Sequence, residues 1–165
     1  VIYLLGGPIY IGFLLGHSLA LRGLDGGGSL GRDWLIFAVL VTFATDSGAC
    51  FTGRLLGRRP LAPTVSPGKT WEGSAGGFVF AVAAALVLGA IFDLKIPLWQ
   101  VGVIGAVVGV AAQWGDLLES KLKRIAGVKD AGNLFPGHGG ILDRLDSIVI
   151  SGPAVYYLVA TVFTS

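Results

Sequence analysis

Charge is scarce in this sequence of 165 residues. Only 13% of the residues are Asp, Glu, Lys or Arg, whereas a soluble domain contains about 25%. Methionine is absent and Cys50 is the single cysteine, so an internal disulfide is excluded. Because the chain begins at Val1 and has no methionine, we expect it to be a piece of a longer protein. With 53% hydrophobic residues and a mean hydropathy of +0.77, the composition is that of a membrane protein.

Long apolar runs take the place of the missing charge. A helix needs about 20 apolar residues to cross the hydrocarbon core of a bilayer, and five stretches meet this length. They are Val1–Leu21, Trp34–Gly53, Gly73–Phe92, Pro97–Gly115 and Leu145–Ser165. We therefore predict one membrane-embedded region over residues 1–165, all-α and polytopic, with about five transmembrane helices and no sheet.

The few basic residues are concentrated in two loops. Four lie between the second and third predicted spans, and five lie between the fourth and fifth. The two loops share one face of the membrane if the five spans alternate in direction. The positive-inside rule makes that face cytoplasmic, so the polar loops should meet where nucleotides are found.

An amphipathic helix is predicted to continue the fourth span over residues Trp114–Val128. At 100° per residue, Asp116, Ser120 and Lys123 form one narrow stripe, and apolar side chains occupy the opposite face. The simplest interpretation is a surface helix with a solvated polar face. The alternative is a polar stripe that belongs to a site, because it begins at the membrane boundary and leads into a glycine-rich loop.

That loop, Phe135–Asp146, carries the groups that phosphate chemistry requires. Glycines around His138 leave the backbone N–H groups free to approach a phosphate closely. Asp143 and Asp146 are three residues apart, which in a helical turn places both carboxylates on one side. Magnesium prefers such oxygen ligands, and Arg144 can bind a phosphate as a fork. The alternative is an ordinary turn before a helix.

The other polar loop contains Ser66-Pro-Gly-Lys-Thr-Trp-Glu-Gly73. Its Gly-Lys-Thr is not a P-loop, because Pro63 stands where that motif requires glycine and no strand precedes it. Ser66, Lys69 and Thr70 instead lie at the start of a membrane helix, whose N-terminus favours anions. Within the second span, Asp46 is an intramembrane carboxylate, which is either functional or a neutral group that holds helices together.

Taken in order, these residues resemble the signature of the phosphatidate cytidylyltransferases, the CDP-diacylglycerol synthases. The matching positions are Ser120, Lys123, Arg124, Lys129, Asp130, Pro136, His138, Gly139, Gly140, Asp143, Arg144 and Asp146. The segments Asp46-Ser-Gly-Ala49 and Ser66–Gly73 also look like blocks of this family. The resemblance covers about Asp46–Asp146 closely and the flanking spans more loosely.

The resemblance implies that CTP and phosphatidate react, with magnesium, to give CDP-diacylglycerol and pyrophosphate. It also implies a homodimer embedded in the lipid bilayer of the cell membrane, with the active site on the cytoplasmic face and no nucleic-acid partner. It assigns metal binding and catalysis to Asp116, Asp143 and Asp146, and catalysis to Lys123. The expected substrate-binding residues are Ser66, Lys69, Thr70, Ser120, Arg124, Lys129, His138, Gly139, Gly140 and Arg144.

Two other functions remain open from the sequence. A CTP-dependent membrane lipid kinase would bind the same nucleotide but move the γ-phosphate. A transporter would use Asp46 and Asp116 as intramembrane carriers and would distribute polar residues along the spans. The polar residues gather in two loops instead, which favours the enzyme.

Overall fold

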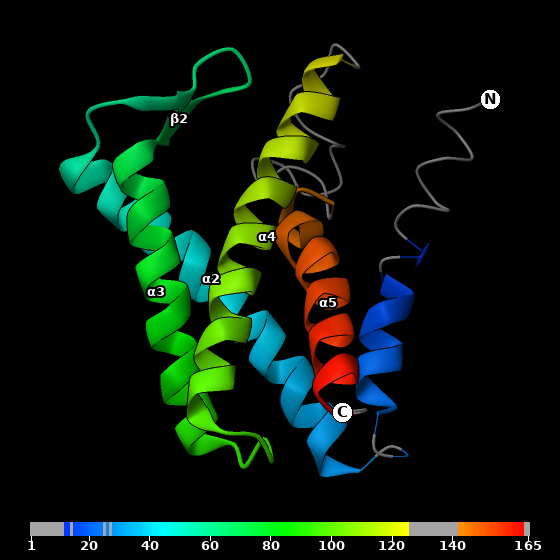
Figure 1. Cartoon of the computed structure of the whole chain (residues 1–165). Helices are drawn as coiled ribbons and strands as arrows, with labels where there is room; N and C mark the ends of the chain where they lie inside the picture. The colour runs from blue at the N-terminus through cyan, green and yellow to red at the C-terminus, as the bar shows by residue number, and fades with distance from the viewer. Residues whose placement is uncertain (1–11, 14, 25, 27, 126–141, 164–165) are drawn as a thin grey trace.

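Helices build almost all of the computed structural model, which describes residues 12–163 except 14, 25, 27 and 126–141. For residues 142–149, 162 and 163 it describes the backbone only. A helical segment over 15–22 precedes the main elements. In chain order these are α2 (Ser29–Leu56), β1 (Pro60–Ala62), β2 (Ser66–Thr70), α3 (Trp71–Ile91), α4 (Leu98–Ile125) and α5 (Leu142–Phe163). The helices run up and down in one bundle, with the strands at one end (Figure 1).

Helices α2, α3 and α4 are each long and apolar enough to cross a membrane. Their most apolar windows are only 33%, 17% and 39% buried inside the bundle. Large apolar side chains such as Phe51, Val79 and Val103 therefore point outward. An apolar exterior of this size is unfavourable in water and suits lipid. A mostly helical structure with three helices able to cross a membrane is consistent with the predicted membrane class, and the count of five spans stays a prediction.

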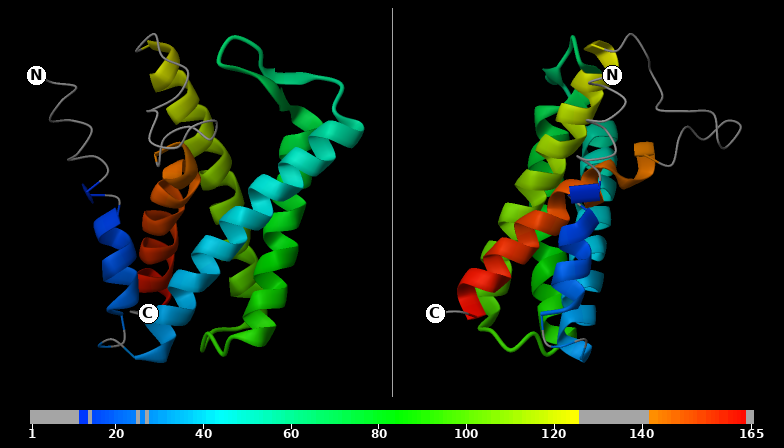
Figure 2. Two further views of the ribbon diagram at one scale, coloured as in Figure 1. Left: turned by 180° about the vertical axis from the view of Figure 1, so that it is seen from behind. Right: turned by 90° about the vertical axis from the view of Figure 1, so that its right-hand side faces the viewer.

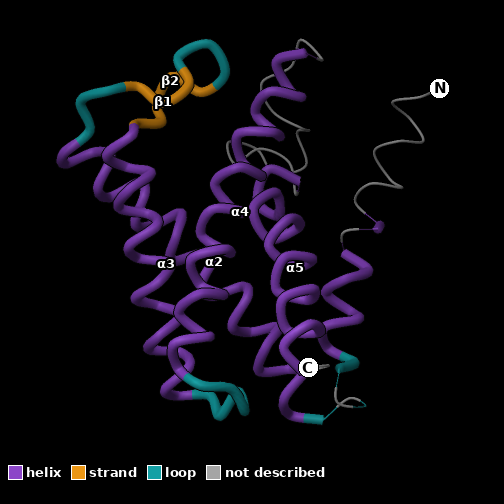
Figure 3. Tube along the Cα trace, in the orientation of Figure 1, coloured by secondary structure: helices purple, strands orange, loops and turns teal. Residues whose placement is uncertain are grey.

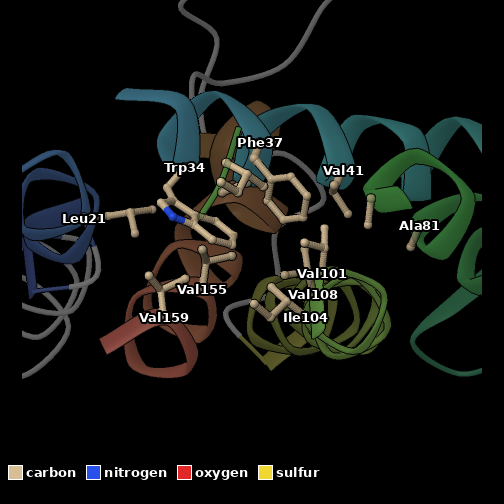
Figure 4. Packing of buried hydrophobic residues seen from close by; sticks show 13 residues of the cluster. Leu21, Trp34, Phe37, Val41, Ala81, Val101, Ile104, Val108, Val155 and Val159 are labelled. Atoms are coloured by element: carbon tan, nitrogen blue, oxygen red, sulfur yellow. The ribbon is translucent and has the colours of Figure 1, made fainter. Parts of the chain in front are cut away.

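The core lies where α2, α4 and α5 come together. Trp34 and Phe37 of α2 pack edge to face, with ring centroids 5.2 Å apart. Figure 4 shows them facing Val155 of α5 and Ile104 of α4. Burying one such side chain stabilises the fold by about 1.5–3 kcal/mol. In a bilayer this figure is an upper bound, because lipid also shields apolar surface.

Small residues allow α4 to lie close against α3. A Cβ added to Gly105 would come within 2.2 Å of the Ala85 Cβ, and one added to Gly109 would come within 2.6 Å of the Ala81 Cβ. Only glycine permits this separation. Toward the end that carries the strands, α3 and α4 spread apart in two opposite views (Figures 1 and 2).

A two-stranded antiparallel hairpin of β1 and β2 corrects the prediction that the chain has no sheet (Figure 3). Its turn is closed by a 3.1 Å hydrogen bond from the Val65 N–H to the Ala62 carbonyl. Pro63 occupies the second turn position, which its fixed φ favours. The strands are short, polar and rich in proline and glycine, so they lack the alternating apolar pattern that identifies a strand in a sequence.

Candidate active site

A cavity of about 370 Å³ lies at the end of the bundle that carries the hairpin. Helices α2, α3 and α4 and strand β2 all contribute to its wall. The lining residues are Asp46, Ala49, Cys50, Gly53, Arg54, Leu61, Gly68, Lys69, Thr70, Gly73, Ser74, Gln113 and Asp116. Two carboxylates and two cations therefore line one cavity in an otherwise apolar bundle.

Lys69 and Asp116 form an ion pair across this cavity. Lys69 belongs to β2 and Asp116 to α4, so a residue predicted in the Ser66–Gly73 loop lies against one predicted on the amphipathic helix. Their side chains are 26% and 31% exposed, respectively. The Lys69 ammonium nitrogen is itself shielded from solvent and, besides Asp116, has no hydrogen-bond acceptor among the described residues. An ammonium group has three donors, so this one has donors to spare for an anion.

The start of α3 fixes the hairpin beside the cavity. The Thr70 Oγ1 accepts a 3.1 Å hydrogen bond from the Gly73 N–H, which is an N-cap. The Glu72 carboxylate accepts hydrogen bonds from the backbone N–H groups of Arg58 and Arg59, at 3.1 and 3.2 Å. Thr70, predicted to bind substrate, therefore has a structural partner as well as a place in the cavity wall. Lys69 directly precedes Thr70, the N-cap residue of α3.

The polar stripe of α4 points into the protein. The amphipathic segment predicted after the fourth span continues α4 without a break to Ile125. On its apolar face Trp114 is 72% exposed, whereas Lys123 on the polar stripe is 20% exposed. This is the reverse of a soluble surface helix. The solvated-face interpretation is wrong for this segment, because its exposed face in this structure is the apolar one.

Other predicted residues of α4 lie beyond the cavity wall, further along the helix. Lys123 pairs with Glu119 at 3.2 Å. The Arg124 Nε donates a 3.4 Å hydrogen bond to the Val65 carbonyl in the hairpin turn. Ser120 is half-buried on the same stretch, and Ser66 begins β2 outside the cavity lining. The hairpin and the last turns of α4 thus meet at one end of the bundle, as predicted.

The remaining predicted residues are placed only in part. Lys129, His138, Gly139 and Gly140 fall outside the described residues. Asp143, Arg144 and Asp146 lie in the first turns of α5, where only the backbone is described. A neighbouring contact places this part of the chain. The Ile150 side chain would lie 2.9 Å from a Cβ on Gly115, the residue before Asp116. The turn that follows Asp146 therefore packs at the level of Asp116.

Four cavity residues with polar or reactive side chains were not predicted as site residues. Ser74 and Gln113 join α3 to α4 by two hydrogen bonds, and Arg54 and Cys50 line the wall on α2. Ser74 and Gln113 were recognisable as uncharged polar residues inside apolar spans. Arg54 was counted only as a basic residue of its loop.

Asp46, Cys50 and Arg54 also line a second hollow, on the outer side of α2. Its other lining residues are Ser47, Phe51 and Leu55, of which Phe51 and Leu55 are well exposed. One side of α2 therefore connects a charged cavity with an apolar exterior. Asp46 lies at that junction, and its function stays a prediction.

The carboxylates of the cavity suit magnesium. Asp46 and Asp116 supply two carboxylates, and no group of three or more metal-binding side chains occurs among the described residues. Magnesium is usually bound by one or two carboxylates, with waters and substrate phosphates completing its coordination. Of the three predicted metal ligands only Asp116 has a described side chain, and with Asp46 it gives the cavity the one or two carboxylates that suit a magnesium ion arriving with a phosphate ligand.

The chain was then compared with known proteins. Residues 5–162 match the model of the Cytidylyltransferase family. The phosphatidate cytidylyltransferase of Bacillus subtilis (strain 168) is 45% identical over 152 residues, which are 92% of this chain and 55% of that protein. The phosphatidate cytidylyltransferase of Brucella suis biovar 1 (strain 1330) is 41% identical over 157 residues, which are 95% of this chain and 56% of that protein.

A third relative gives the same result. The phosphatidate cytidylyltransferase of Staphylococcus saprophyticus is 44% identical over 130 residues, which are 79% of this chain and 50% of that protein. The chain spans about half the length of the curated relatives it matches. A family match over residues 5–162 confirms the resemblance found in the sequence, and the chain belongs to the cytidylyltransferase family.

Proposed function

We propose that this chain forms the catalytic part of a CTP:phosphatidate cytidylyltransferase. The observation that carries the proposal is the cavity that brings Lys69 of the hairpin against Asp116 of α4. These residues are 47 positions apart in the chain, both are assigned to the site by the resemblance, and they meet at the polar end of an apolar bundle. Relatives named phosphatidate cytidylyltransferase supply the substrate class.

The reaction is a nucleotidyl transfer. A phosphate oxygen of the lipid attacks the α-phosphorus of CTP, and a new P–O bond forms. The bond between the α-phosphorus and the oxygen bridging to the β-phosphate breaks, and pyrophosphate leaves with that oxygen. Such transfers depend mainly on alignment and charge neutralisation. No nucleophilic serine or cysteine of the protein is needed.

The residues of the cavity have distinct parts in this reaction. Lys69 neutralises and orients a phosphate of CTP as a point charge. Asp116, together with Asp143 and Asp146, would hold magnesium, which would supply further positive charge where the two polyanions meet. The phosphate oxygens are bound by four further cations, which are Lys123, Arg124, Lys129 and Arg144. Additional hydrogen bonds to the substrates come from Ser66, Thr70, Ser120, His138, Gly139 and Gly140.

The two hollows on α2 suggest how the substrates enter. CTP comes from the aqueous end of the bundle, which we place in the cytoplasm because two loops at that end carry most of the basic residues. Phosphatidate stays in the bilayer and approaches along the outer side of α2, past Phe51 and Leu55. Arg54 lines both hollows and carries a charge suited to the lipid phosphate. The resemblance adds a homodimer to this proposal.

Isotope labelling of the full-length protein tests the proposed reaction. The purified enzyme receives phosphatidate, magnesium and CTP that carries the label either on the α-phosphate or on the γ-phosphate. We expect the α-label in the lipid and the γ-label in pyrophosphate. A γ-label in the lipid would instead identify a lipid kinase, and no lipid labelling from either nucleotide would refute both enzymes.

A further inference from the structure

Ser74 and Gln113 form a polar contact inside the bundle that none of the site assignments includes. The Gln113 Oε1 accepts a hydrogen bond from the Ser74 Oγ. The Gln113 Nε2 donates a 3.2 Å hydrogen bond to the Ser74 backbone carbonyl. A backbone carbonyl can only accept, so the amide nitrogen must face the Ser74 carbonyl and the amide oxygen the Ser74 hydroxyl. Both ends of one amide are thus held by a single residue of the neighbouring helix.

The contact lies where small-residue packing between α3 and α4 gives way to the cavity. Gly105 and Gly109 bring the helices together further from the hairpin, against Ala85 and Ala81. Closer to the hairpin, Ser74 and Gln113 link the helices and also line the cavity. Gly77, one turn after Ser74, makes room for the amide, since a Cβ there would lie 3.3 Å from the Gln113 Nε2. The Gln113 amide therefore occupies a space that Gly77 leaves open on α3.

Each partner is close in the chain to one member of the ion pair. Gln113 is three residues before Asp116, which places both on the same face of α4. Ser74 is five residues after Lys69, and the chain between them is fixed by the Thr70 cap. A slip of α3 by one residue along α4 would move Lys69 by about 1.5 Å relative to Asp116. That movement is large enough to break an ion pair.

We propose that Ser74 and Gln113 are positioning residues, which hold α3 and α4 in the register that places Lys69 against Asp116. The proposal deepens the proposed function, on which its catalytic part rests. Neither residue has to touch a substrate. The polar pair is suited to this task because a hydrogen bond between two membrane helices requires particular residues to face each other, and it does so at the end where the close Gly–Ala packing of α3 and α4 has ended.

The register is tested without reference to catalysis by spin-label distances in the full-length protein. Labels on cysteines introduced at the exposed positions Thr64 and Leu122 report the separation of the hairpin and the end of α4, with Cys50→Ser and any other native cysteine replaced. We expect one narrow distance distribution, and a broader or shifted one in Gln113→Leu and in Ser74→Ala. Gln100→Leu, which changes the other glutamine of α4 at its far end, should leave the distribution unchanged.

Activity is measured on the same variants without the labels. Gln113→Leu and Ser74→Ala should lower kcat/KM by about tenfold or more, because small displacements of catalytic groups have effects of this size. Ser74→Thr, which keeps the hydroxyl, should restore most of the activity, and Gln100→Leu should behave as wild type.

Three results would overturn the proposal. An unchanged distance distribution with lost activity would mean that these residues act on the substrate directly. A changed distribution with full activity would mean that the register does not serve the site. An unchanged distribution with full activity would mean that Ser74 and Gln113 neither hold the register nor serve catalysis. If the wild-type protein fails to transfer cytidylyl groups, the distances still test the register. Failure of the proposed function can therefore be distinguished from failure of the positioning proposal.

Discussion

The ion pair between Lys69 and Asp116 should be measurable as an energetic coupling. We consider Lys69→Met and Asp116→Asn, which remove one charge each with little change in volume, together with the double variant. Two unit charges about 4 Å apart interact by about 1 kcal/mol in water and about 4 kcal/mol at an effective dielectric constant near 20. Because the two side chains are 26% and 31% exposed, we expect a coupling of about 1.5–2.5 kcal/mol.

The coupling is obtained from a double-mutant cycle. Free energies of unfolding are measured for the full-length protein and the three variants in mixed micelles without nucleotide or magnesium, so that only the ion pair contributes. A second cycle on Arg32 and Asp33 is the control, because that pair lies 3.0 Å apart with a 58% exposed arginine. It should give no more than about 0.5 kcal/mol. A Lys69–Asp116 coupling as small as the control would refute the account of how the hairpin is held against α4.

Three further predictions concern the site and the topology. Asp143→Asn should abolish turnover in a folded protein, and near-wild-type activity across a magnesium titration would contradict a metal-binding function for Asp143. Lys69→Ala should raise the KM for CTP more than the KM for phosphatidate; unchanged KM values and kcat in a normally inserted protein would leave Lys69 as a topology residue only. Cysteines introduced at Arg58 and Lys129 should react with a membrane-impermeant reagent from one side of the membrane, and a cysteine introduced at Asp93 should react from the other side. Reaction of the cysteines at Arg58 and Lys129 from opposite sides would overturn the topology.

The sequence predicted the helices of this fold well, because span length and hydropathy leave few alternatives in a bilayer. Four predicted spans overlap helices α2 to α5, and their ends agree within about five residues, except that α4 continues past Gly115 to Ile125 over the predicted amphipathic segment. The hairpin was missed for a physical reason. Its strands are held by the turn at Pro63 and by the Glu72 carboxylate, which accepts from two backbone N–H groups. Neither contact leaves an apolar periodicity in the sequence.

The same contrast applies to the site. Lys69 and Asp116 were predicted from two separate motifs, but their pairing depends on how α3 and α4 diverge, which no local pattern contains. The direction of the α4 polar stripe was ambiguous, because an amphipathic helix has the same periodicity in water and at a membrane. Gln113 lies only three residues before Asp116 and was missed, since its partner Ser74 is 39 residues away in the chain.

The central claim is that CTP binds in the cavity between β2, α2 and α4, and Cys50 provides the most direct test. This thiol is exposed and lines the cavity. The rate at which a water-soluble maleimide modifies Cys50 is measured in the full-length protein, with any other cysteine replaced. CTP with magnesium should slow the modification at least tenfold, whereas ATP should have little effect. A Cys50 rate that stays the same at saturating CTP would contradict the account.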